Sequence, residues 1–204
     1  METVLILDFG AQYSQLIARR VREQNVYCEV KPCSISPDEI RELAPIGIIL
    51  SGGPQSVYES VSLHVDPALF SLGIPVLGIC YGCQLMAYSL GGTVAAATEA
   101  TAREYGKTLT EFDTQSAIFH GLPASSVTWM SHGDYISQVP DGFTVTAKTA
   151  VCPTAAMACP EKKLYGVQFH PEVQHTVQGS EILRRFLYSV CGASGDWTMA
   201  DYRQ

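Results

Sequence analysis

The stretch "PVLGICYGCQLMA", residues 75–87, decides the fold. It starts as an apolar run typical of a buried strand, at 75–79, and it leads into a helical pattern at 84–90 that stops at two glycines. Between them, "GICYG" at 78–82 has the spacing of a nucleophile elbow, a sharp turn from a strand into a helix. Side chains two residues before and after the nucleophile would collide, which explains both flanking glycines. We therefore predict an α/β fold that presents Cys80 at the end of a central strand.

Strand and helix patterns alternate through the first half of the chain. The pattern predicts strands at 3–9, 26–30, 46–50 and 75–79, and helices at 13–24, 36–44 and 84–90. The second of these helices opens with Ser36 as N-cap, followed by Pro37 in the first turn. This alternation predicts a mainly parallel central sheet with helices on both faces.

The second half has a different pattern, with short β-type runs separated by turns. These runs lie at 107–112, 126–130, 135–139 and 143–149, followed by a strand at 163–169 and a helix at 180–190. Asp141-Gly142, between two of the runs, is a hairpin signal. We expect a smaller antiparallel β portion here, one domain over 1–191, and a polar linker or tail over 192–204.

The overall composition limits the class of protein. The 204 residues are 47% hydrophobic and 16% charged, which suits one globular domain with a sizeable core. The net charge of -7 argues against nucleic acid or an anionic membrane as the main partner. No apolar run reaches the length of a membrane span, and the N-terminus lacks the basic region of a signal peptide. We expect a cytoplasmic protein.

The seven cysteines do not form a recognisable framework. Their number is odd, and no second ligand pair completes a zinc motif around Cys80 and Cys83. We expect reduced thiols that are mostly buried, and no metal site.

At the elbow, Cys80 has the surroundings of a nucleophile. The helix that follows directs its free N–H groups and positive dipole end toward the sulfur, which favours the thiolate. The N–H of Tyr81 can point at an oxyanion. Two other interpretations remain: a buried structural cysteine, or a redox pair with Cys83. In the nucleophile interpretation, Cys83 lies one turn further along, faces inward and is inert.

A thiolate nucleophile needs a base, and the base needs a group that orients it. Of the five histidines, His170 lies at the end of a predicted strand, where α/β sheets present their sites. Glu172 follows two residues later and points the same way in an extended chain, which Pro171 favours. The sequence therefore predicts a Cys-His-Glu triad of Cys80, His170 and Glu172.

Two further loops follow predicted strands. In "LSGGP", residues 50–54, Gly52 and Gly53 would let backbone N–H groups approach a ligand as a second oxyanion donor; the alternative is a plain β-turn. In "WMSHGD", residues 129–134, polar groups flank a glycine; the alternative is an N-capped turn.

Together these motifs resemble those of the class I (triad) glutamine amidotransferases. "GICYGCQ" is similar to the family's nucleophile motif, "LSGGP" to its oxyanion loop and "GVQFHPE" to its His-x-Glu motif, in the family's order and over nearly the whole chain. The resemblance implies a flavodoxin-like architecture and hydrolysis of L-glutamine through a thioester on a cysteine. It also implies substrate-binding roles for several residues of two segments: Gln84, Ser131, His132, Gly133 and Asp134.

Within that family, "ILDFGAQYSQLIARRVRE", "SGGPQSVY" and "WMSHGD" look most like the glutaminase domains of GMP synthetases. The resemblance implies that ammonia passes to an ATP-pyrophosphatase domain or subunit, absent here, that converts XMP to GMP. ATP and Mg²⁺ would belong to that part, and the glutaminase step would need no cofactor. It further implies a full-length enzyme that forms a homodimer, and weak activity of the isolated chain.

Other functions remain open on the sequence. The chain could be the glutaminase component for anthranilate or carbamoyl phosphate synthesis. It could also be a thiol redox or stress protein that uses Cys80 and Cys83, a non-catalytic glutamine-binding regulator, or a cysteine peptidase.

Overall fold

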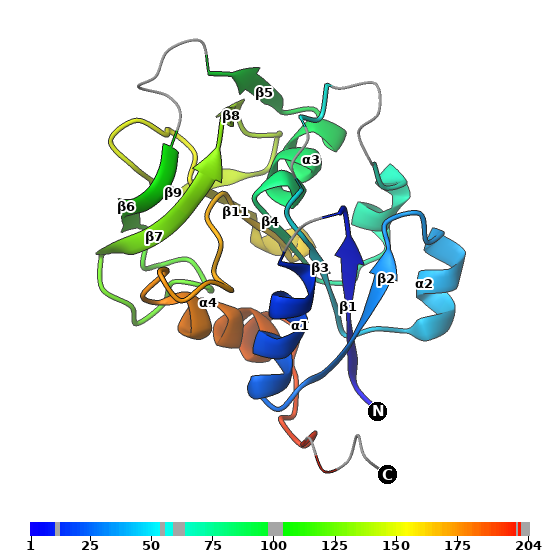
Figure 1. Ribbon diagram of the computed structural model, residues 1–204. Coiled ribbons are helices and arrows are strands. Elements are labelled where there is room, and N and C mark those ends of the chain that lie inside the picture. Colours follow the sequence, from blue (N-terminus) through cyan, green and yellow to red (C-terminus); the bar gives the residue numbers. More distant parts are fainter. Residues whose placement is uncertain (11–12, 54–55, 59–63, 98–103, 199, 201–204) are drawn as a thin grey trace.

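The computed structural model describes residues 1–10, 13–53, 56–58, 64–97, 104–198 and 200. Pro54 of the 50–54 loop, and residues 199 and 201–204 of the tail, therefore lie outside the described part. The structure is built on one nine-stranded sheet, in the order β2-β1-β3-β4-β11-β10-β9-β6-β7, and a separate ribbon of β5 and β8 (Figure 1). The predicted fold class, a largely parallel sheet with flanking helices and a smaller antiparallel portion, is confirmed.

The first half of the sheet is parallel. Its strands are β2 (Tyr27–Pro32), β1 (Thr3–Asp8), β3 (Gly47–Leu50), β4 (Val76–Ile79) and β11 (Leu164–Val167). Every neighbouring pair among them runs in the same direction. The carboxyl ends of these strands consequently meet at one edge, and the loops that follow β3, β4 and β11 lie there.

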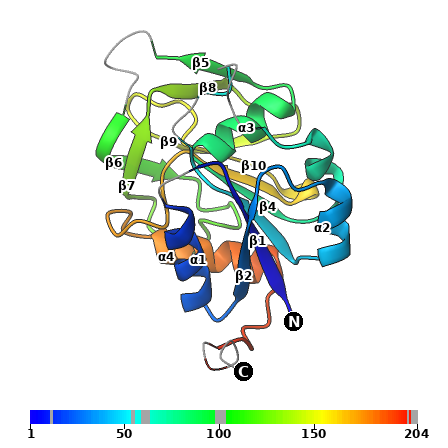
Figure 2. The ribbon, with the colours of Figure 1, turned by 45° about the vertical axis from the view of Figure 1, so that its right-hand side comes forward.

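Helices cover both faces of the parallel half (Figure 2). Alternate residues of β1 divide between two hydrophobic clusters: Val4 and Ile6 face one side, and Leu5 and Leu7 face the other. The first cluster includes buried residues of α1 (Ser14–Glu23) and α4 (Gly179–Arg185). The second includes residues of α2 (Pro37–Leu43), α3 (Tyr81–Ser89) and the short 3₁₀ helix η1 (Pro67–Ser71).

Antiparallel strands extend the same sheet. They are β10 (Ala156–Cys159), β9 (Thr144–Lys148), β6 (Glu104–Phe112) and β7 (Ser125–His132). The ribbon pairs β5 (Thr93–Ala96) with β8 (Asp134–Gln138). Sequence patterning missed β5 and β10: β10 reads "AMAC" and has none of the β-branched or aromatic residues that favour strands.

Two details of the predicted elements are wrong. Gly142 adopts φ +86° in a turn, but β8 pairs with β5 while β9 pairs with β6 and β10, so Asp141-Gly142 joins two sheets and forms no hairpin. The helix expected at 84–90 begins at Tyr81, directly after the elbow. The helix expected at 180–190 is present: it runs as α4 to Arg185 and continues as a π-helical segment, Phe186–Val190.

The predicted start of α2 is confirmed in its side-chain detail. The Oγ of Ser36 accepts a hydrogen bond from the N–H of Glu39 at 3.1 Å and donates to Oε1 of Glu39 at 3.2 Å. The hydroxyl thus satisfies one of the N–H groups that a helix leaves free in its first turn.

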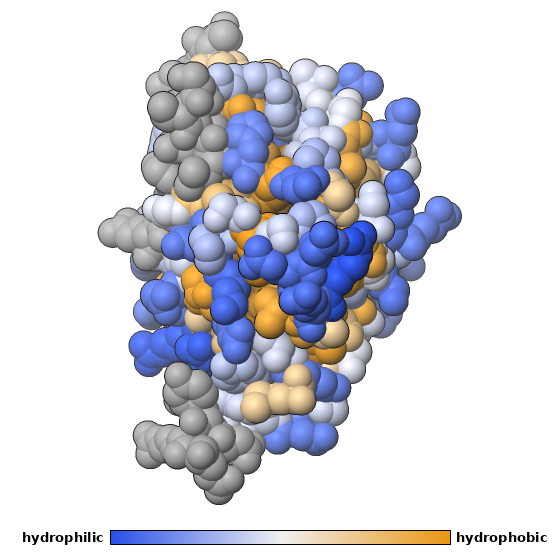
Figure 3. All heavy atoms as spheres, turned by 90° about the vertical axis from the view of Figure 1, so that its right-hand side faces the viewer, coloured by the Kyte–Doolittle hydropathy of each residue, from blue (hydrophilic) through white to orange (hydrophobic). Residues whose placement is uncertain are grey.

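The described part of the tail packs against the domain. Ser194 donates to the carboxylate of Glu2 through both its N–H and its Oγ, each at 2.9 Å. Trp197 is buried, with its ring 5.7 Å from that of Tyr27. The surface on the right-hand side of Figure 1, shown face-on in Figure 3, is mainly hydrophilic with smaller apolar areas. None of the helices in the described ranges is long and apolar enough to cross a bilayer.

Candidate active site

The predicted nucleophile elbow is present at the junction of β4 and α3. Cys80 has φ 53° and ψ -110°, a conformation that L residues rarely adopt and that indicates backbone strain. A Cβ on Gly78 would lie 2.6 Å from the carbonyl oxygen of Gly82, and a Cβ on Gly82 would lie 2.5 Å from that of Leu50. Both positions therefore require glycine, for the steric reason that the sequence suggested.

His170 and Glu172 form a direct pair. Nδ1 of His170 lies 2.6 Å from Oε1 of Glu172, and both side chains are buried. Two hydrogen bonds fix the His170 backbone: its N–H donates to the carbonyl of Trp129 at 3.0 Å, and its carbonyl accepts from Oγ1 of Thr176 at 2.6 Å. The imidazole is therefore oriented by a carboxylate and held on a backbone tied to β7.

The structure brings Cys80 and His170 together. Both side chains flank Gly52, where an added Cβ would lie 3.1 Å from Cε1 of His170 and 3.6 Å from Cβ of Cys80. Burial lowers the pKa of His170, but the hydrogen bonds and negative charges of Cys80 and Glu172 outweigh burial and raise it well above 6.5. The cluster thus favours an imidazolium beside the sulfur.

Gln168 also contacts the sulfur, and sequence reasoning missed it. Its Nε2 donates to Sγ of Cys80 at 3.6 Å, and its Oε1 accepts from Nε2 of Gln84 at 3.0 Å. The sequence contained a signal for Gln168, because residues 168 and 170 lie on the same side of an extended chain. Tyr13 was missed as well; its ring lies edge-on to that of His170, with centroids 5.7 Å apart.

The predicted substrate segment 131–134 borders the sulfur through its backbone. The carbonyl of Ser131 accepts from Sγ of Cys80 at 3.6 Å, and the carbonyl of Asp134 accepts from Nε2 of Gln84 at 3.0 Å. The carbonyl of Gly133 accepts from the N–H of Ala97 at 3.1 Å. Of these three carbonyls, that of Ser131 is the one that contacts the sulfur.

His132 differs from its neighbours. Its side chain is only 1% exposed and faces the interior, where Nε2 lies 3.2 Å from Oε1 of Glu104 and Nδ1 lies 2.7 Å from the carbonyl of Asp134. Both ring nitrogens therefore have protein partners, and the side chain lies in the protein interior, on the side of the 131–134 segment away from solvent.

The predicted oxyanion loop follows β3. Gly52 lies against Cys80 and His170, whereas a Cβ on Gly53 would lie 3.2 Å from the carbonyl of Phe9 and 3.4 Å from the ring of Tyr81. Among the hydrogen bonds of the described residues, none uses the N–H of Gly52 or Gly53. These donors remain available to a ligand, and Gly52 is the nearer of the two to the sulfur.

Cys83 faces inward, as predicted. It is completely buried, and its Sγ would lie 2.6 Å from a Cβ on Gly166. Burial, with smaller effects of Cys80 and Cys152, raises the pKa of the Cys83 thiol well above its ordinary value. All seven cysteines are free, so Cys80 and Cys83 do not form a disulfide in this structure.

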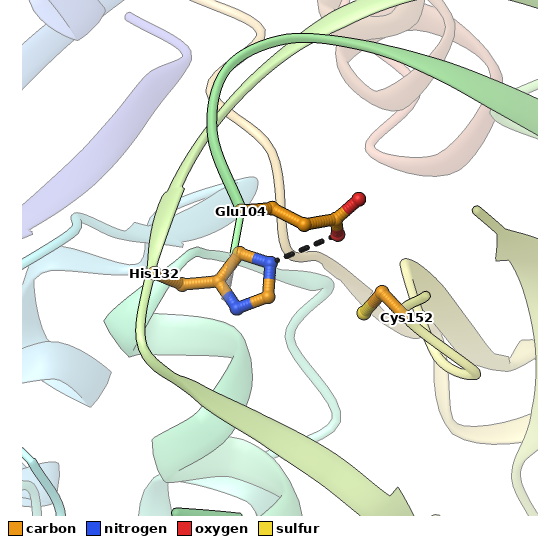
Figure 4. Close-up of side chains that lie close together, drawn as sticks. All are labelled: Glu104, His132 and Cys152. Atoms are coloured by element: carbon orange, nitrogen blue, oxygen red, sulfur yellow. Dashed lines mark hydrogen bonds and ion pairs between the residues drawn. The ribbon is translucent and has the colours of Figure 1, made fainter. Parts of the chain in front are cut away.

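One further cluster contains groups that could ligate a metal ion: Glu104, His132 and Cys152, whose ligand atoms lie within 4.8 Å of one another (Figure 4). Each ligand atom has a protein partner. Oε2 of Glu104 accepts from Oγ1 of Thr149 at 2.8 Å, and Sγ of Cys152 donates to the carbonyl of Thr154 at 3.3 Å. Burial, with the charge of Glu104, raises the pKa of Cys152 to about 12, which keeps it a thiol. The cluster is therefore satisfied by the protein alone.

Comparison with known sequences gives a consistent match. Residues 5–190 match the family described as Glutamine amidotransferase class-I. The chain is 54% identical over 201 residues to a protein of Clostridium botulinum (strain Alaska E43 / Type E3) named GMP synthase [glutamine-hydrolyzing]. It is 57% identical over 198 residues to a protein of the same name from Caldanaerobacter subterraneus. These matches cover 98% and 97% of this chain, but the chain spans only 39% and 38% of those relatives.

Solved structures agree with the fold. A protein from Thermoplasma acidophilum, described as one of the subunits of a GMP synthase, superposes with a TM-score of 0.83 at 32% identity, covering 100% of this chain and 96% of that one. A glutamine amidotransferase from Thermotoga maritima superposes with a TM-score of 0.74 at 20% identity, covering 94% and 99%. The second match supports the fold alone.

Proposed function

The chain belongs to the class I glutamine amidotransferase family, and on this premise we propose that it hydrolyses L-glutamine to glutamate and ammonia. The observation that carries the proposal is the arrangement of three side chains: His170 lies with Cys80 beside Gly52, and its Nδ1 lies 2.6 Å from Oε1 of Glu172. An acyl-transfer reaction needs a nucleophile, a group that moves a proton and a group that orients it. Cys80, His170 and Glu172 supply these three roles.

In the first half of the reaction, the Cys80 thiolate attacks the side-chain amide carbon of glutamine. The carbonyl oxygen becomes an oxyanion, which the N–H groups of Gly52 or Gly53 and Tyr81 stabilise by roughly 3–4 kcal/mol for each well-placed donor. His170 gives its proton to the amide nitrogen, the C–N bond breaks and ammonia leaves. The products are a glutamyl thioester on Cys80 and a neutral imidazole.

In the second half, His170 takes a proton from water, and the resulting hydroxide attacks the thioester carbonyl. A second oxyanion forms at the same donors and collapses with cleavage of the C–S bond. Glutamate leaves, and the thiolate and imidazolium are restored. Glu172 keeps Nδ1 of His170 as the bonded nitrogen, so that Nε2 is the one that exchanges protons. These steps use side chains, backbone N–H groups and water.

Gln84 recognises the amino-acid end of the substrate in this proposal. Both hydrogens of its Nε2 are donated within the protein, to the carbonyl of Asp134 and to Oε1 of Gln168. Its Oε1 is therefore the atom left to accept a hydrogen bond from a ligand, and an α-ammonium group is a strong donor for it. Ser131, Gly133 and Asp134 add backbone groups on the same side.

We assign residues 1–191 as the glutaminase domain and 192–204 as the segment that leads toward a synthetase. The names of the relatives, which are more than twice as long, support a role in GMP synthesis. We propose XMP as the precursor and the cytoplasm as the location. ATP and Mg²⁺ would act on the synthetase domain or subunit, and the complete enzyme would be a homodimer. The alternative within the family, anthranilate or carbamoyl phosphate synthesis, has less support from the names of the relatives.

A direct assay tests the proposal. The purified chain is incubated with L-glutamine, and glutamate release is followed for the native protein and for Cys80→Ala. We expect slow turnover by the native chain, none by Cys80→Ala, and, after acid quenching, a mass increase of one glutamyl group on the peptide that contains Cys80. Addition of the synthetase portion of a relative with XMP and ATP should accelerate glutamate release. A native chain without turnover or adduct in either condition would refute the proposal.

A further inference from the structure

Glu104 and His132 form a buried pair at the end of the β6–β7 ladder, where they are direct cross-strand partners. Figure 4 shows the two side chains pointing toward each other, with Cys152 approaching from a separate segment. Relative exposure of the two side chains is 6% and 1%. Ionisable side chains are almost never buried to this degree unless they are paired, so each of these two side chains depends on the other as its partner.

The hydrogen-bond partners of His132 fix its ring at both nitrogens. A backbone carbonyl can only accept, so Nδ1 of His132 carries a hydrogen and donates it to the carbonyl of Asp134 at 2.7 Å. Nε2 lies 3.2 Å from Oε1 of Glu104. Glu104 therefore fixes the rotation of the imidazole ring.

Glu104 is itself fixed by the loop that follows β9. Its Oε2 accepts from Oγ1 of Thr149 at 2.8 Å. That hydroxyl oxygen in turn accepts from the N–H groups of Val151 and Cys152, at 3.3 and 2.9 Å. The hydroxyl hydrogen is thus directed at Glu104, and the ends of three strands, β6, β7 and β9, converge on one carboxylate.

The Asp134 carbonyl transmits this arrangement toward the sulfur. It accepts from His132 and also from Nε2 of Gln84 at 3.0 Å. An amide side chain can bind in two orientations that differ by exchange of its oxygen and nitrogen. A fixed carbonyl at this point accepts only the nitrogen, so it sets the orientation of the Gln84 amide and directs Oε1 to the remaining side.

We propose that Glu104 and His132 are a positioning pair that holds the Asp134 carbonyl and, through it, the Gln84 amide in the orientation that binds the amino-acid end of glutamine. The inference rests on the proposed glutaminase function and adds two residues that do not touch the substrate. Because Gln84 contacts the α-ammonium group and not the reacting amide, loss of the pair weakens substrate binding more than chemistry.

The test compares two variants of one residue. His132→Asn keeps an N–H donor for the Asp134 carbonyl, whereas His132→Leu removes it. We expect His132→Leu to raise KM for glutamine about tenfold, the size of one lost hydrogen bond to a charged group, with kcat within about threefold. His132→Asn should restore KM to within about threefold of the native value, because a donor remains. Glu104→Gln should raise KM in the same direction by a smaller factor.

Glutaramate, which is glutamine without its α-ammonium group, distinguishes positioning from a general loss of structure. A purely structural role of the pair would leave the preference for glutamine over glutaramate unchanged. The preference of the native protein for glutamine over glutaramate, as a ratio of kcat/KM values, should fall about tenfold in His132→Leu. The matched control is Thr128→Val, which removes the buried 2.7 Å contact between Thr128 and Thr110 on the same two strands. It should lower the melting temperature without changing KM or the preference.

Several outcomes would overturn the inference. The first is a KM for glutamine in His132→Leu that equals the native value. The second is a rise of KM in Thr128→Val as large as that in His132→Leu. The third is one equivalent of zinc that stays bound to the native protein through dialysis and is absent from Cys152→Ala. Calorimetric binding of glutamine in a Cys80→Ala background repeats the comparison without turnover, and Glu104→Gln replaces His132→Leu if that variant does not fold. A native protein that neither binds nor hydrolyses glutamine would refute the proposed function itself, which separates the two failures.

Discussion

The carbonyl oxygen of Leu50, at the end of β3, would lie 2.5 Å from a Cβ on Gly82 in the first turn of α3. The first turn of α3 therefore rests directly on the backbone of the neighbouring strand. This contact, rather than the flexibility of glycine, fixes the place of the helix N-terminus beside Cys80.

Gly82→Ala should consequently destabilise the protein by about 2–3 kcal/mol, because a methyl group forces backbone apart at a packed junction. Denaturant unfolding measures the effect. Gly133→Ala is the matched control, since a Cβ there would meet only the Tyr105 hydroxyl at 3.4 Å, and its unfolding free energy should stay within about 0.5 kcal/mol of the native value. Equal losses in the two variants would contradict the steric account.

The two cysteines of the elbow should behave differently. Cys80→Ala should lower glutaminase kcat/KM by at least about 10⁴-fold, because the nucleophile is lost. Cys83→Ala should keep activity within about threefold, because the Cys83 thiol is buried and its pKa is raised, so it supplies no thiolate. A redox function would require both thiols, so comparable loss in the two variants would favour that alternative.

The charge state of His170 should depend on Glu172. The raised pKa of His170 means that the folded protein holds a proton that the unfolded chain releases above about pH 6.5. The resulting stabilisation is fully present below that pH and is lost as pH rises through the higher folded pKa. Glu172→Gln removes one cause of the shift, so NMR titration should give a lower His170 pKa in the variant. The stability gap between native and variant should stay constant from pH 6.5 to the folded His170 pKa of the variant and narrow above it, toward the native pKa of about 11. A gap that does not narrow between those two pKa values would contradict the assignment.

Gln168 should affect the sulfur directly. Gln168→Met removes the Nε2–H donor at 3.6 Å from Sγ of Cys80 while keeping a side chain of similar volume. We expect alkylation of Cys80 by iodoacetamide to slow by about fivefold at pH 7.5, because negative charge on the sulfur loses a hydrogen bond. The control is the same reaction on Gln15→Met, an exposed position in α1. An unchanged rate in Gln168→Met would show that the contact has no electrostatic effect.

The sequence predicted the parallel half of the fold and the geometry around Cys80 because both follow from local rules. A strand that turns into a helix around a nucleophile needs glycine at fixed spacings, and His-Pro-Glu places two side chains on one side of an extended chain. Positions such as 78, 82, 170 and 172 are therefore readable without knowledge of the rest of the chain.

What the sequence could not supply are contacts between distant segments. Glu104 and His132 meet only because β6 and β7 pair in a particular register, and one residue of slip would turn both side chains to the other face. The direction of the His132 side chain also depends on this pairing. The sequence placed His132 with Ser131 in a ligand-binding segment, although alternate residues of a strand face opposite sides. Asp141-Gly142 carried a true turn signal, but no local pattern states which strands a turn will pair.

The N–H of His170 donates to Trp129 on β7, although β11, the strand that precedes His170, is separated from β7 by β10, β9 and β6 in the sheet. This single hydrogen bond therefore joins the end of β11 to a strand four positions away in the same sheet. Its length depends on how strongly the sheet is twisted and coiled. Its amide proton should exchange with deuterium at a rate that reports that coiling. A bound amino acid that contacts both Cys80 and the 131–134 segment would hold these two parts of the sheet at a fixed separation. Slower exchange of the His170 amide proton would then report that glutamine is bound, without any turnover.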